Sequence, residues 1–335
     1  MAKIVTMGEM MLRLSTPSNN RFVQCDSFDA VYGGSEANVA LSLACFGHDA
    51  YFVSKLPKHE IGQSAVNVLR RYGVHTDYIA RGGERIGIYF LETGAALRSS
   101  QVIYDRKDSA IALADESDFD FDDIMKDASY FHVSGITPAI SDKAAHLTKA
   151  ALIAAKKHGV KVSFDLNYRS KLWTIEKAQS VLIPLMEYVD VCIANPEAVE
   201  CCLGVKDEHY EDILNYDNVL KQLCNEYNFE YIVYTFRDGA NASVNGVKAM
   251  IYNGEEVYVS KRHEINPILD RIGGGDAFTA GLIYGLLDKE NFKEVLEFAI
   301  AADAYKHCIN GDFNIASVEE INALAYGNAI GRVKR

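Results

Sequence analysis

The sequence predicts an α/β protein of three layers, in which helices cover both faces of a mostly parallel central sheet and a small β-sheet forms a lid. Strand-like and helical runs alternate through most of the 335 residues, which is typical of a parallel sheet buried on both faces. Two segments, 12–32 and 85–106, break this alternation with strand-like runs and no helix between them. Two glycine-rich stretches lead directly into apolar helical runs.

Apolar residues at helical or strand spacing define each element in order along the chain. The run at 3–7 reads as a buried strand, and the helix expected at 36–46 has Val39, Leu41 and Ala44 at apolar positions. Further strands are expected at 51–54, 160–165, 189–194 and 231–235, and further helices at 63–72, 142–158, 175–187, 276–287 and 292–307. No repeat or linker interrupts the series, so we expect residues 1–335 to form a single domain.

Composition and charge exclude several classes of protein and of binding partner. Hydrophobic residues make up 49% of the chain, which excludes a disordered protein. The net charge of −12 disfavours nucleic acid and anionic membrane surfaces as partners. No run approaches the roughly 18 apolar residues of a membrane span, and the charged N-terminal stretch does not resemble a signal peptide. We therefore expect a cytoplasmic protein.

The segments 12–32 and 85–106 are expected to form a small antiparallel sheet that stands off the main body. Neither segment supplies a helix to cover a parallel sheet. Ligands of open α/β sheets bind beyond the carboxyl ends of the strands, so a lid would close at that edge.

The stretch DRIGGGDAFTAG at 270–281 is the strongest candidate for a catalytic site. Glycines let the backbone approach a ligand, and the first N–H groups of a helix lack intrahelical partners, so Gly273, Gly274 and Gly275 can form an anion hole. Asp276 in the first helical turn is then placed to act as a general base. The alternative is a glycine turn with an Asp cap. The stretch matches neither a P-loop nor a GxGxxG motif.

A second glycine stretch, GGSEANVA at 33–40, also opens an apolar helix. Its backbone and Asn38 can hydrogen-bond a hydroxylated ligand, although a plain turn and helix start would read the same way.

Together these two stretches resemble the signatures of the ribokinase-like (PfkB) carbohydrate kinases, and the similarity covers nearly the whole chain. Within that family, GEMMLRLS at 8–15, KLP at 55–57 and FDLNYRSKLW at 164–173 look most like 2-keto-3-deoxygluconate kinases. The resemblance implies a ribokinase-like three-layer sandwich with a small β-sheet lid. It also implies transfer of the ATP γ-phosphoryl group to a sugar hydroxyl, with ATP and Mg²⁺ as cofactors.

The resemblance assigns roles to individual residues. It implies Asp276 as the base, with the amides of Gly273–Gly275 holding the developing phosphate charge. Sugar contacts implied by it are Gly33, Gly34, Asn38, Tyr89, Tyr104, Arg106, Arg169, Asp276 and Asp312. Nucleotide contacts implied by it are Asn167, Asn195, Thr235, Arg237, Gly239, Gly273 and Gly275.

Three positions depart from the family pattern. Ala198 stands where the N-x-x-E motif has Glu, so the protein ligands of magnesium are left open, with Glu197 and Glu200 as substitutes. The stretch TFRDG at 235–239 resembles the family's nucleotide-side T-x-G loop, and Arg237 stands at a glycine-like position in it. Arg271 replaces a small residue and either reaches a phosphate or pairs with a surface carboxylate. Whether a monovalent cation activates the protein is also left open.

A protein of net charge −12 that binds an anionic sugar acid needs local positive charge at the site. Arg106 follows the lid-like strand 101–105, and Arg169 follows the core strand that ends near Asp165, so both are expected where the lid faces the sheet edge. Arginine suits bidentate capture of a carboxylate. The alternative for Arg106 is a surface pair with Asp105 or Asp108. Arg13 is a further candidate.

The favoured interpretation is an ATP-dependent kinase that converts 2-keto-3-deoxygluconate to its 6-phosphate. A neutral-sugar kinase of fructokinase or ribokinase type is the first alternative, and a sugar-binding regulator without turnover is the second. A lid sheet with apolar faces favours a dimer.

Overall fold

The computed structural model describes residues 1–206, 216–239, 241–289 and 291–327. Its strands are β1 (Lys3–Met7), β2 (Met11–Ser15), β3 (Asp29–Gly33), β4 (Asp49–Leu56), β5 (Ile79–Arg81), β6 (Gly87–Glu92), β7 (Gln101–Asp105), β8 (Tyr130–Ser134), β9 (Lys161–Asp165), β10 (Val191–Ala194), β11 (Tyr231–Arg237), β12 (Asn245–Tyr252), β13 (Val257–Val259) and β14 (His263–Ile265). Ten of these form one sheet and four form another.

The large sheet has the strand order β13-β12-β11-β10-β9-β8-β1-β4-β5, with β14 also paired to β12. All neighbours from β11 to β5 run parallel, as the alternation of strands and helices predicts. At the other edge β12 runs antiparallel to β11, β13 and β14. The parallel strands therefore present their carboxyl ends along one edge of the sheet.

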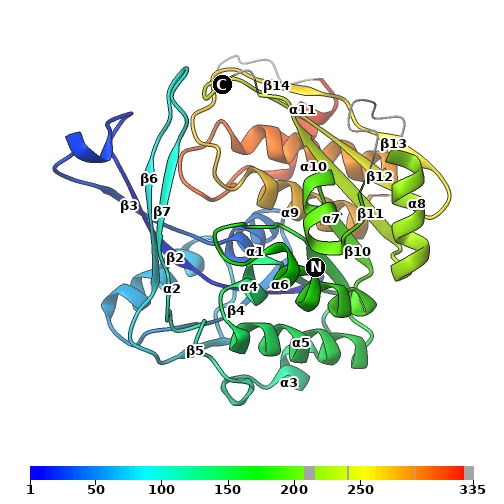
Figure 1. Ribbon diagram of the computed structural model, residues 1–335, viewed down its shortest axis with the longest axis horizontal. Helices are drawn as coiled ribbons and strands as arrows, with labels where there is room; N and C mark the ends of the chain where they lie inside the picture. The colour runs from blue at the N-terminus through cyan, green and yellow to red at the C-terminus, as the bar shows by residue number, and fades with distance from the viewer. Residues whose placement is uncertain (207–215, 240, 290, 328–335) are drawn as a thin grey trace.

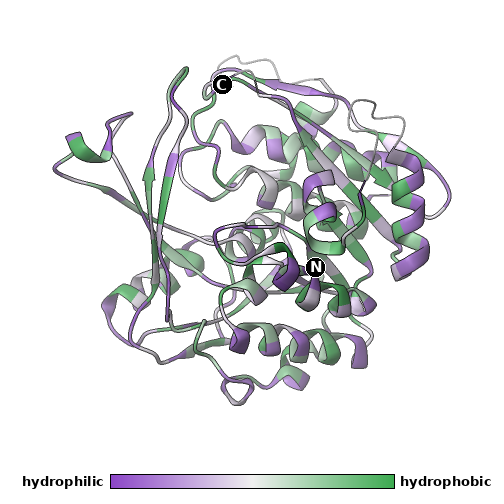
Figure 2. Ribbon diagram, in the orientation of Figure 1, coloured by the Kyte–Doolittle hydropathy of each residue, from purple (hydrophilic) through white to green (hydrophobic). Residues whose placement is uncertain are grey.

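Helices cover both faces of this sheet (Figure 1). One face carries α1 (Ser35–Cys45), α2 (Glu60–Arg71), α9 (Gly274–Asp288), α10 (Phe292–Lys306) and α11 (Val318–Ala325). The other carries α3 (Phe121–Met125), α4 (Ile136–Ala139), α5 (Asp142–Lys157), α6 (Ile175–Leu182), α7 (Pro196–Leu203) and α8 (Tyr216–Tyr227). Hydrophobic residues follow the central strands, and hydrophilic residues lie on the outer turns of α5 and α8 (Figure 2). The three-layer α/β prediction is confirmed.

The small sheet, in the order β3-β2-β6-β7, stands beside the main body (Figure 1). Its strands fall within or one residue outside the predicted segments 12–32 and 85–106. The expectation of a purely antiparallel sheet is wrong, because β2 and β6 run parallel. Each segment supplies an antiparallel pair, and the long crossover through α1, β4 and α2 lets the two pairs join in parallel.

One predicted helix is shorter than expected. The run 175–187 forms α6 and then continues as a 3₁₀ helix at Ile183–Tyr188. Pro184 supplies no backbone N–H and its ring crowds the preceding turn, so a regular α-helix cannot continue through it.

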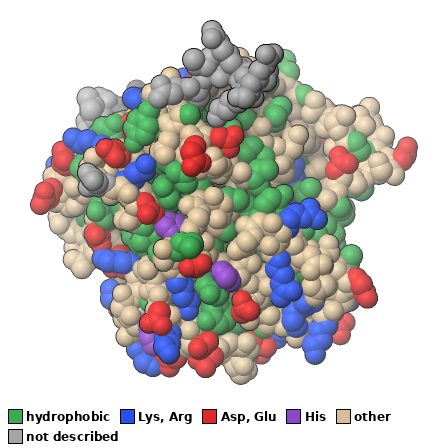
Figure 3. Space-filling view, turned by 180° about the vertical axis from the view of Figure 1, so that it is seen from behind, with side chains coloured by type: hydrophobic (Ala, Val, Ile, Leu, Met, Phe, Trp, Pro, Cys, Tyr) green, Lys and Arg blue, Asp and Glu red, His purple; other side chains and the backbone are tan. Residues whose placement is uncertain are grey.

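The surface fits the charge balance of the sequence. On the face seen in Figure 3, acidic and basic side chains are both scattered among hydrophobic and other residues. In the described part of the chain, no helix is both long and apolar enough to span a bilayer.

Candidate active site

A cavity of about 1000 Å³ opens beyond the carboxyl ends of the central strands. Its walls come from the ends of β9, β10 and β11, from the first turns of α1 and α9, and from β6 and β7 of the small sheet. The predicted site residues that line it are Gly34, Asn38, Tyr89, Tyr104, Arg106, Asn167, Arg169, Asn195, Thr235, Arg237, Gly273, Gly274, Gly275, Asp276 and Asp312.

Two of the predicted site glycines, Gly33 and Gly239, are not among the residues that line the cavity. A Cβ added to Gly33 would lie 1.9 Å from Asp312 Oδ2, so Gly33 lets the end of β3 pack against that carboxyl. Gly239 faces Asn245 and Arg271, with an added Cβ at 3.2 Å from Asn245 Oδ1. The structure therefore gives both glycines a packing reason for having no side chain.

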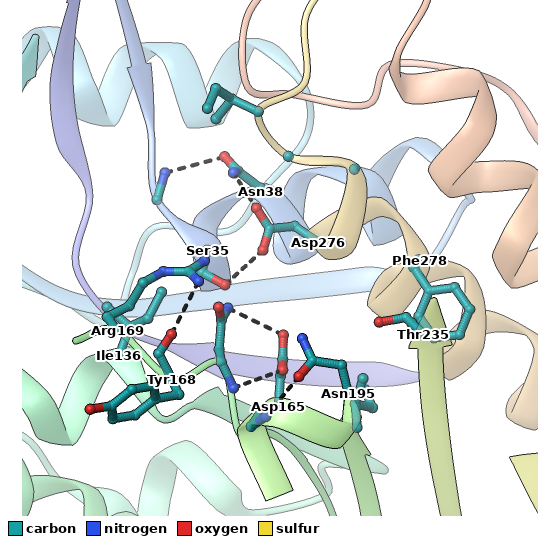
Figure 4. A pocket seen from close by; sticks show the side chains of 18 of the residues that line it. Ser35, Asn38, Ile136, Asp165, Tyr168, Arg169, Asn195, Thr235, Asp276 and Phe278 are labelled. Carbon is teal, nitrogen blue, oxygen red and sulfur yellow. Dashed lines mark hydrogen bonds between the residues drawn. The ribbon is translucent and has the colours of Figure 1, made fainter. Parts of the chain in front are cut away.

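Asp276 lies in the first turn of α9 and receives two hydrogen bonds from the first turn of α1 (Figure 4). Ser35 Oγ donates to its Oδ1 at 2.7 Å, and Asn38 Nδ2 donates to its Oδ2 at 2.6 Å. Burial raises the pKa of Asp276, whereas the hydrogen bonds from Asn38 and Ser35 lower it. The two glycine-rich stretches therefore meet at this carboxylate and hold it in one orientation.

The glycine turn before Asp276 is packed too tightly for side chains. Gly273 caps α9 with φ of 85°, in the left-handed region, and an added Cβ would lie 2.0 Å from the carbonyl oxygen of Asp312. A Cβ on Gly274 would lie 2.4 Å from Asp303 Oδ1 on α10. The first N–H groups of α9 have no intrahelical partner, so the turn offers donors and the positive end of the helix dipole to an anion.

Two further carboxyls, the buried Glu36 and the half-buried Asp165, lie near Asp276, and neither was assigned a role from the sequence. Glu36 Oε1 accepts hydrogen bonds from the N–H and hydroxyl of Ser134 and from the hydroxyl of Thr137, while burial raises its pKa. Burial and the charge of Asp276 raise the pKa of Asp165 to about 7, against the opposing effect of Arg169. Both residues lie inside the quoted motifs, but only the fold brings them to the cavity.

Arg106 lines the cavity beside the small sheet, and its guanidinium is already paired. Its Nε donates to Glu9 Oε2 at 2.7 Å, and its Nη2 forms an ion pair with the same oxygen. The alternative of a surface pair with Asp105 or Asp108 is wrong, because Asp105 pairs with Arg85 instead. Glu9 follows β1 directly, which is why the topology rather than the local sequence brings it to Arg106.

Arg169 is the more available cation. Its side chain is exposed, and it donates to the backbone carbonyl of Tyr168 at 3.3 Å. Its charge lowers the pKa of both Asp165 and Asp276, and Figure 4 shows it extending towards Ser35 and Asp276. A positive charge therefore stands free to meet an anionic ligand close to the catalytic candidate.

Asp312 is held by residues of the small sheet. Arg13 Nη1 donates to its Oδ1 at 2.8 Å, and the Tyr89 hydroxyl donates to its Oδ2 at 2.5 Å. Arg13 Nη2 also donates to Asp270 Oδ2 at 2.7 Å, just before the glycine turn. Arg13 is thus fully engaged within the protein and does not line the cavity. Its role is to join β2 to the loops on either side of α9 and α10.

The wall formed by β10 and β11 carries the predicted nucleotide contacts. Asn195 Oδ1 accepts the N–H of Ala198 at 2.7 Å and so caps α7, which places Ala198 inside the helix start. Thr235 and Arg237 lie on β11 and line the cavity. An added Cβ on Gly275 would lie 3.4 Å from Arg237 Nη2, so this arginine lies beside the glycine turn.

Arg271 lines the cavity, and its guanidinium donates to backbone carbonyls rather than to a surface carboxylate. Its Nη2 donates to the carbonyl of Asn241 at 2.6 Å and its Nε to the carbonyl of Ala242 at 3.4 Å, so it ties down a loop at the cavity rim. Across the described residues, no group of three or more His, Cys, Asp or Glu side chains gathers as a metal cluster would.

Comparison with known proteins agrees with this geometry. Residues 1–305 match the pfkB family carbohydrate kinase model. A 2-dehydro-3-deoxygalactonokinase of Haloferax volcanii is 32% identical over 98% of both chains. The crystal structure of a 2-dehydro-3-deoxygluconokinase from Thermotoga maritima is 49% identical, covers 97% of this chain and 98% of its own, and superposes with a TM-score of 0.95. A PfkB family carbohydrate kinase from Listeria grayi is 35% identical, with coverage of 97% and 99% and a TM-score of 0.91.

The family match spans both glycine-rich stretches and all the residues that line the cavity except Asp312. The chain therefore belongs to the pfkB family of carbohydrate kinases.

Proposed function

We propose that this carbohydrate kinase transfers the γ-phosphoryl group of ATP to a hydroxyl of a sugar acid, with 2-keto-3-deoxygluconate converted to its 6-phosphate as the preferred reaction. The observation that carries the proposal is Arg169, an exposed guanidinium extending into a cavity whose catalytic candidate is Asp276. The names of the similar kinases from Thermotoga maritima and Haloferax volcanii, both of which act on keto-deoxy sugar acids, support the same substrate class.

Asp276 is the base in this proposal. Its two hydrogen bonds from Ser35 and Asn38 orient the carboxylate and favour its ionised form, while burial keeps its pKa above the ordinary value. A base with a raised pKa removes a proton from a hydroxyl more readily, provided that it stays ionised at the working pH. The sugar hydroxyl therefore gives its proton to Asp276 as its oxygen attacks the γ-phosphorus of ATP. The bond from that phosphorus to the bridging oxygen breaks, and ADP leaves.

The glycine turn and Arg237 receive the phosphoryl charge. The free N–H groups and the positive end of the helix dipole both lie at the start of α9, where Asp276 also lies. Arg237 lies beside Gly275, so an arginine in the glycine-like position adds positive charge at this turn. These donors stabilise charge on the transferring group rather than on the ground-state sugar.

ATP is expected along the wall that carries Asn167, Asn195, Thr235 and Arg237. Magnesium commonly binds through one or two carboxylates together with substrate phosphates and water. Asp165 and Glu197 both line this cavity, and burial together with the charge of Asp276 raises the pKa of Asp165 to about 7, so a cation beside this carboxyl would favour its ionised form. These two residues would hold the ion, which neutralises phosphate charge when bound.

The small sheet is proposed to act as a lid over the sugar. Tyr89 and Tyr104 bring β6 and β7 to the cavity, and the pairing of Arg106 with Glu9 ties the end of β7 to β1. The sheet also exposes apolar side chains such as Val31 and Ile103, and we infer that it pairs with a second copy of the chain. Light scattering on the purified protein measures that state.

The neutral-sugar alternative has one observation in its favour. Arg106 is neutralised by Glu9, so only Arg169 offers an unpaired charge to a carboxylate among the two arginines predicted to bind it. A coupled ADP-release assay with sugar acids, fructose and ribose separates the alternatives. The proposal expects the highest kcat/KM for a keto-deoxy sugar acid. Preference for fructose or ribose would contradict it, and no turnover with any sugar would favour the non-catalytic alternative.

A further inference from the structure

Lys306, the last residue of α10, carries a buried charge that the proposed mechanism does not use. Its side chain is fully buried, with an exposed fraction of 0%. An ammonium group removed from water costs free energy unless hydrogen bonds and opposite charges compensate for it. Burial accordingly lowers the pKa of Lys306, while Asp270 and Asp312 oppose that shift. Because a buried lysine costs free energy, its presence here indicates a structural or functional role.

The side chain of Lys306 lies directly against the start of the catalytic helix. Its Cε is 3.4 Å from the point where a Cβ on Gly273 would stand. Its Nζ donates to the carbonyl of Ile309 at 3.0 Å, and so holds the loop whose Asp312 carbonyl packs on Gly273. The lysine therefore supports the glycine turn from the side of α10.

Lys306 also balances the charges around that turn. Arg13, Asp270, Asp312 and Lys306 form what we call the buried charge cluster, and each is less than 10% exposed. Arg13 bonds both carboxylates, at 2.7 and 2.8 Å, which pairs one positive charge with two negative ones. Lys306 supplies the second positive charge. Without it, an uncompensated negative charge would lie beneath the turn that receives a phosphoryl group.

We propose that Lys306 is a positioning residue that serves as a built-in cation beneath the glycine turn. It holds Gly273 in place and balances Asp270 and Asp312, so that the turn binds phosphoryl oxygens without a separately bound monovalent cation. The inference rests on the proposed kinase function and answers a question that the sequence leaves open. A lysine suits this role because its ammonium is a compact charge on a tether.

Three variants test the inference. Lys306→Ala removes the charge and leaves space beside Gly273 for a small ammonium ion, whereas Lys306→Met removes the charge and largely fills the space. Lys293→Ala, on the exposed side of the same helix, is the matched control. Turnover is measured by ADP release in the presence of Mg²⁺ with tetramethylammonium as the only monovalent cation, and again after replacing it with ammonium or methylammonium at equal ionic strength.

We expect the wild type and Lys293→Ala to be insensitive to the exchange of cations. Lys306→Ala should lose about tenfold or more in kcat, in the range seen when a charge-stabilising donor is removed, and ammonium should restore several-fold. Lys306→Met should lose a similar factor and should not recover. Wild-type turnover by Lys306→Ala in tetramethylammonium, or equal rescue of the Ala and Met variants by ammonium, would overturn the inference.

Two readouts keep the test decisive. If the variants do not fold, the turnover of the wild type with and without potassium or ammonium tests the inference. Equal turnover supports a built-in cation, and activation by either ion would show that the site lacks its own cation. If the wild type phosphorylates no sugar, the proposed function fails, and the thermal stability of Lys306→Ala still reports on the cluster. Ammonium, but not tetramethylammonium, should then raise its melting temperature relative to Lys306→Met. Equal melting curves in the two salts would contradict the inference.

Discussion

The side-chain amide of Asn38 donates a hydrogen bond of 2.6 Å to the carboxylate of Asp276, across 238 residues of sequence. This contact joins the first turn of α1 to the first turn of α9, which line the same cavity. The same helix start supplies Ser35, so one glycine-rich stretch orients the catalytic candidate carried by the other.

Replacing Asp276 with Asn should lower kcat by about two to four orders of magnitude, the usual contribution of a positioned base. Binding of ATP, measured by calorimetry, should be largely kept, because the shape of the turn is unchanged. Asp288→Asn, at the other end of α9, is the control and should leave kcat unchanged. Turnover of Asp276→Asn within threefold of the wild type, on folded protein, would contradict the assignment.

Removing the two donors to Asp276 should shift the pH dependence of catalysis. Ser35 and Asn38 favour the ionised carboxylate, so the double variant Ser35→Ala, Asn38→Ala should have a higher pKa at Asp276. The base then stays protonated to a higher pH. The acidic limb of the kcat profile should therefore move to higher pH, and an unmoved or lowered limb would argue against these hydrogen bonds as the tuning device.

Asp165 should impose a pH dependence on stability. Its folded-state pKa of about 7 lies above the ordinary value of roughly 3.9, so between these values the folded protein binds more protons than the unfolded chain. The stabilising contribution of this group is complete below pH 4 and is lost as the pH rises through 7. The free energy of unfolding of Asp165→Asn, relative to the wild type, should thus rise between pH 5 and 8 by roughly 2–3 kcal/mol.

Urea unfolding at both pH values measures this difference. Asp142, an exposed carboxylate whose pKa is lowered by its hydrogen bond to Lys177, is the control, and Asp142→Asn should show a nearly constant difference over the same range. A constant difference for Asp165→Asn as well would mean that Asp165 is ionised throughout.

Much of the fold could be predicted from the sequence because local patterns carry it. Alternating strands and helices imply the parallel sheet, and the strand-like runs at 12–32 and 85–106 imply the second sheet. The antiparallel edge formed by β12, β13 and β14 was missed. The two three-residue strands β13 and β14 form only through pairing with β12, which in turn pairs with β11.

The site was predictable only in part, for a related reason. Asp276 and its glycines are marked by local backbone requirements, and most other predicted residues do line the cavity. The partners of Arg106 and Arg13 come from distant segments, so no spacing rule shows that Glu9, Asp270 and Asp312 occupy these guanidinium groups. The role of Lys306 could not be predicted either, because the helical pattern of 292–306 does not show that Asp270, Asp312 and Arg13 lie near its side chain.

Closure of the small sheet is testable by hydrogen exchange. If this sheet covers the sugar, amide exchange in residues 85–106 should slow when a sugar acid and a non-hydrolysable ATP analogue are added together. Helix α5, on the outer side of the molecule, should be unaffected and serves as the internal reference. Equal exchange in 85–106 with and without saturating ligands would remove the lid from the account.

Recognition of the substrate carboxylate is best examined at Arg169. Arg106 is the weaker probe, because its loss would leave the buried Glu9 unpaired and destabilise the fold. Arg169 is exposed and donates to the Tyr168 carbonyl, so its replacement should leave the fold intact. Arg169→Lys keeps the charge without the planar fork and is the matched variant. Each enzyme is assayed above the acidic limb of its own pH profile, because Arg169 also lowers the pKa of Asp276.

The most direct test is the ratio of kcat/KM for 2-keto-3-deoxygluconate to kcat/KM for fructose, measured for the wild type and for Arg169→Ala. One charge-assisted hydrogen bond to a carboxylate contributes on the order of 1.5–3 kcal/mol, so the ratio should fall roughly 10- to 150-fold in the variant. The ratio for Arg169→Lys should lie between those of the wild type and Arg169→Ala. The kcat/KM for fructose should barely change in either variant. A wild type that prefers fructose, or a ratio unchanged by Arg169→Ala, would contradict the sugar-acid assignment.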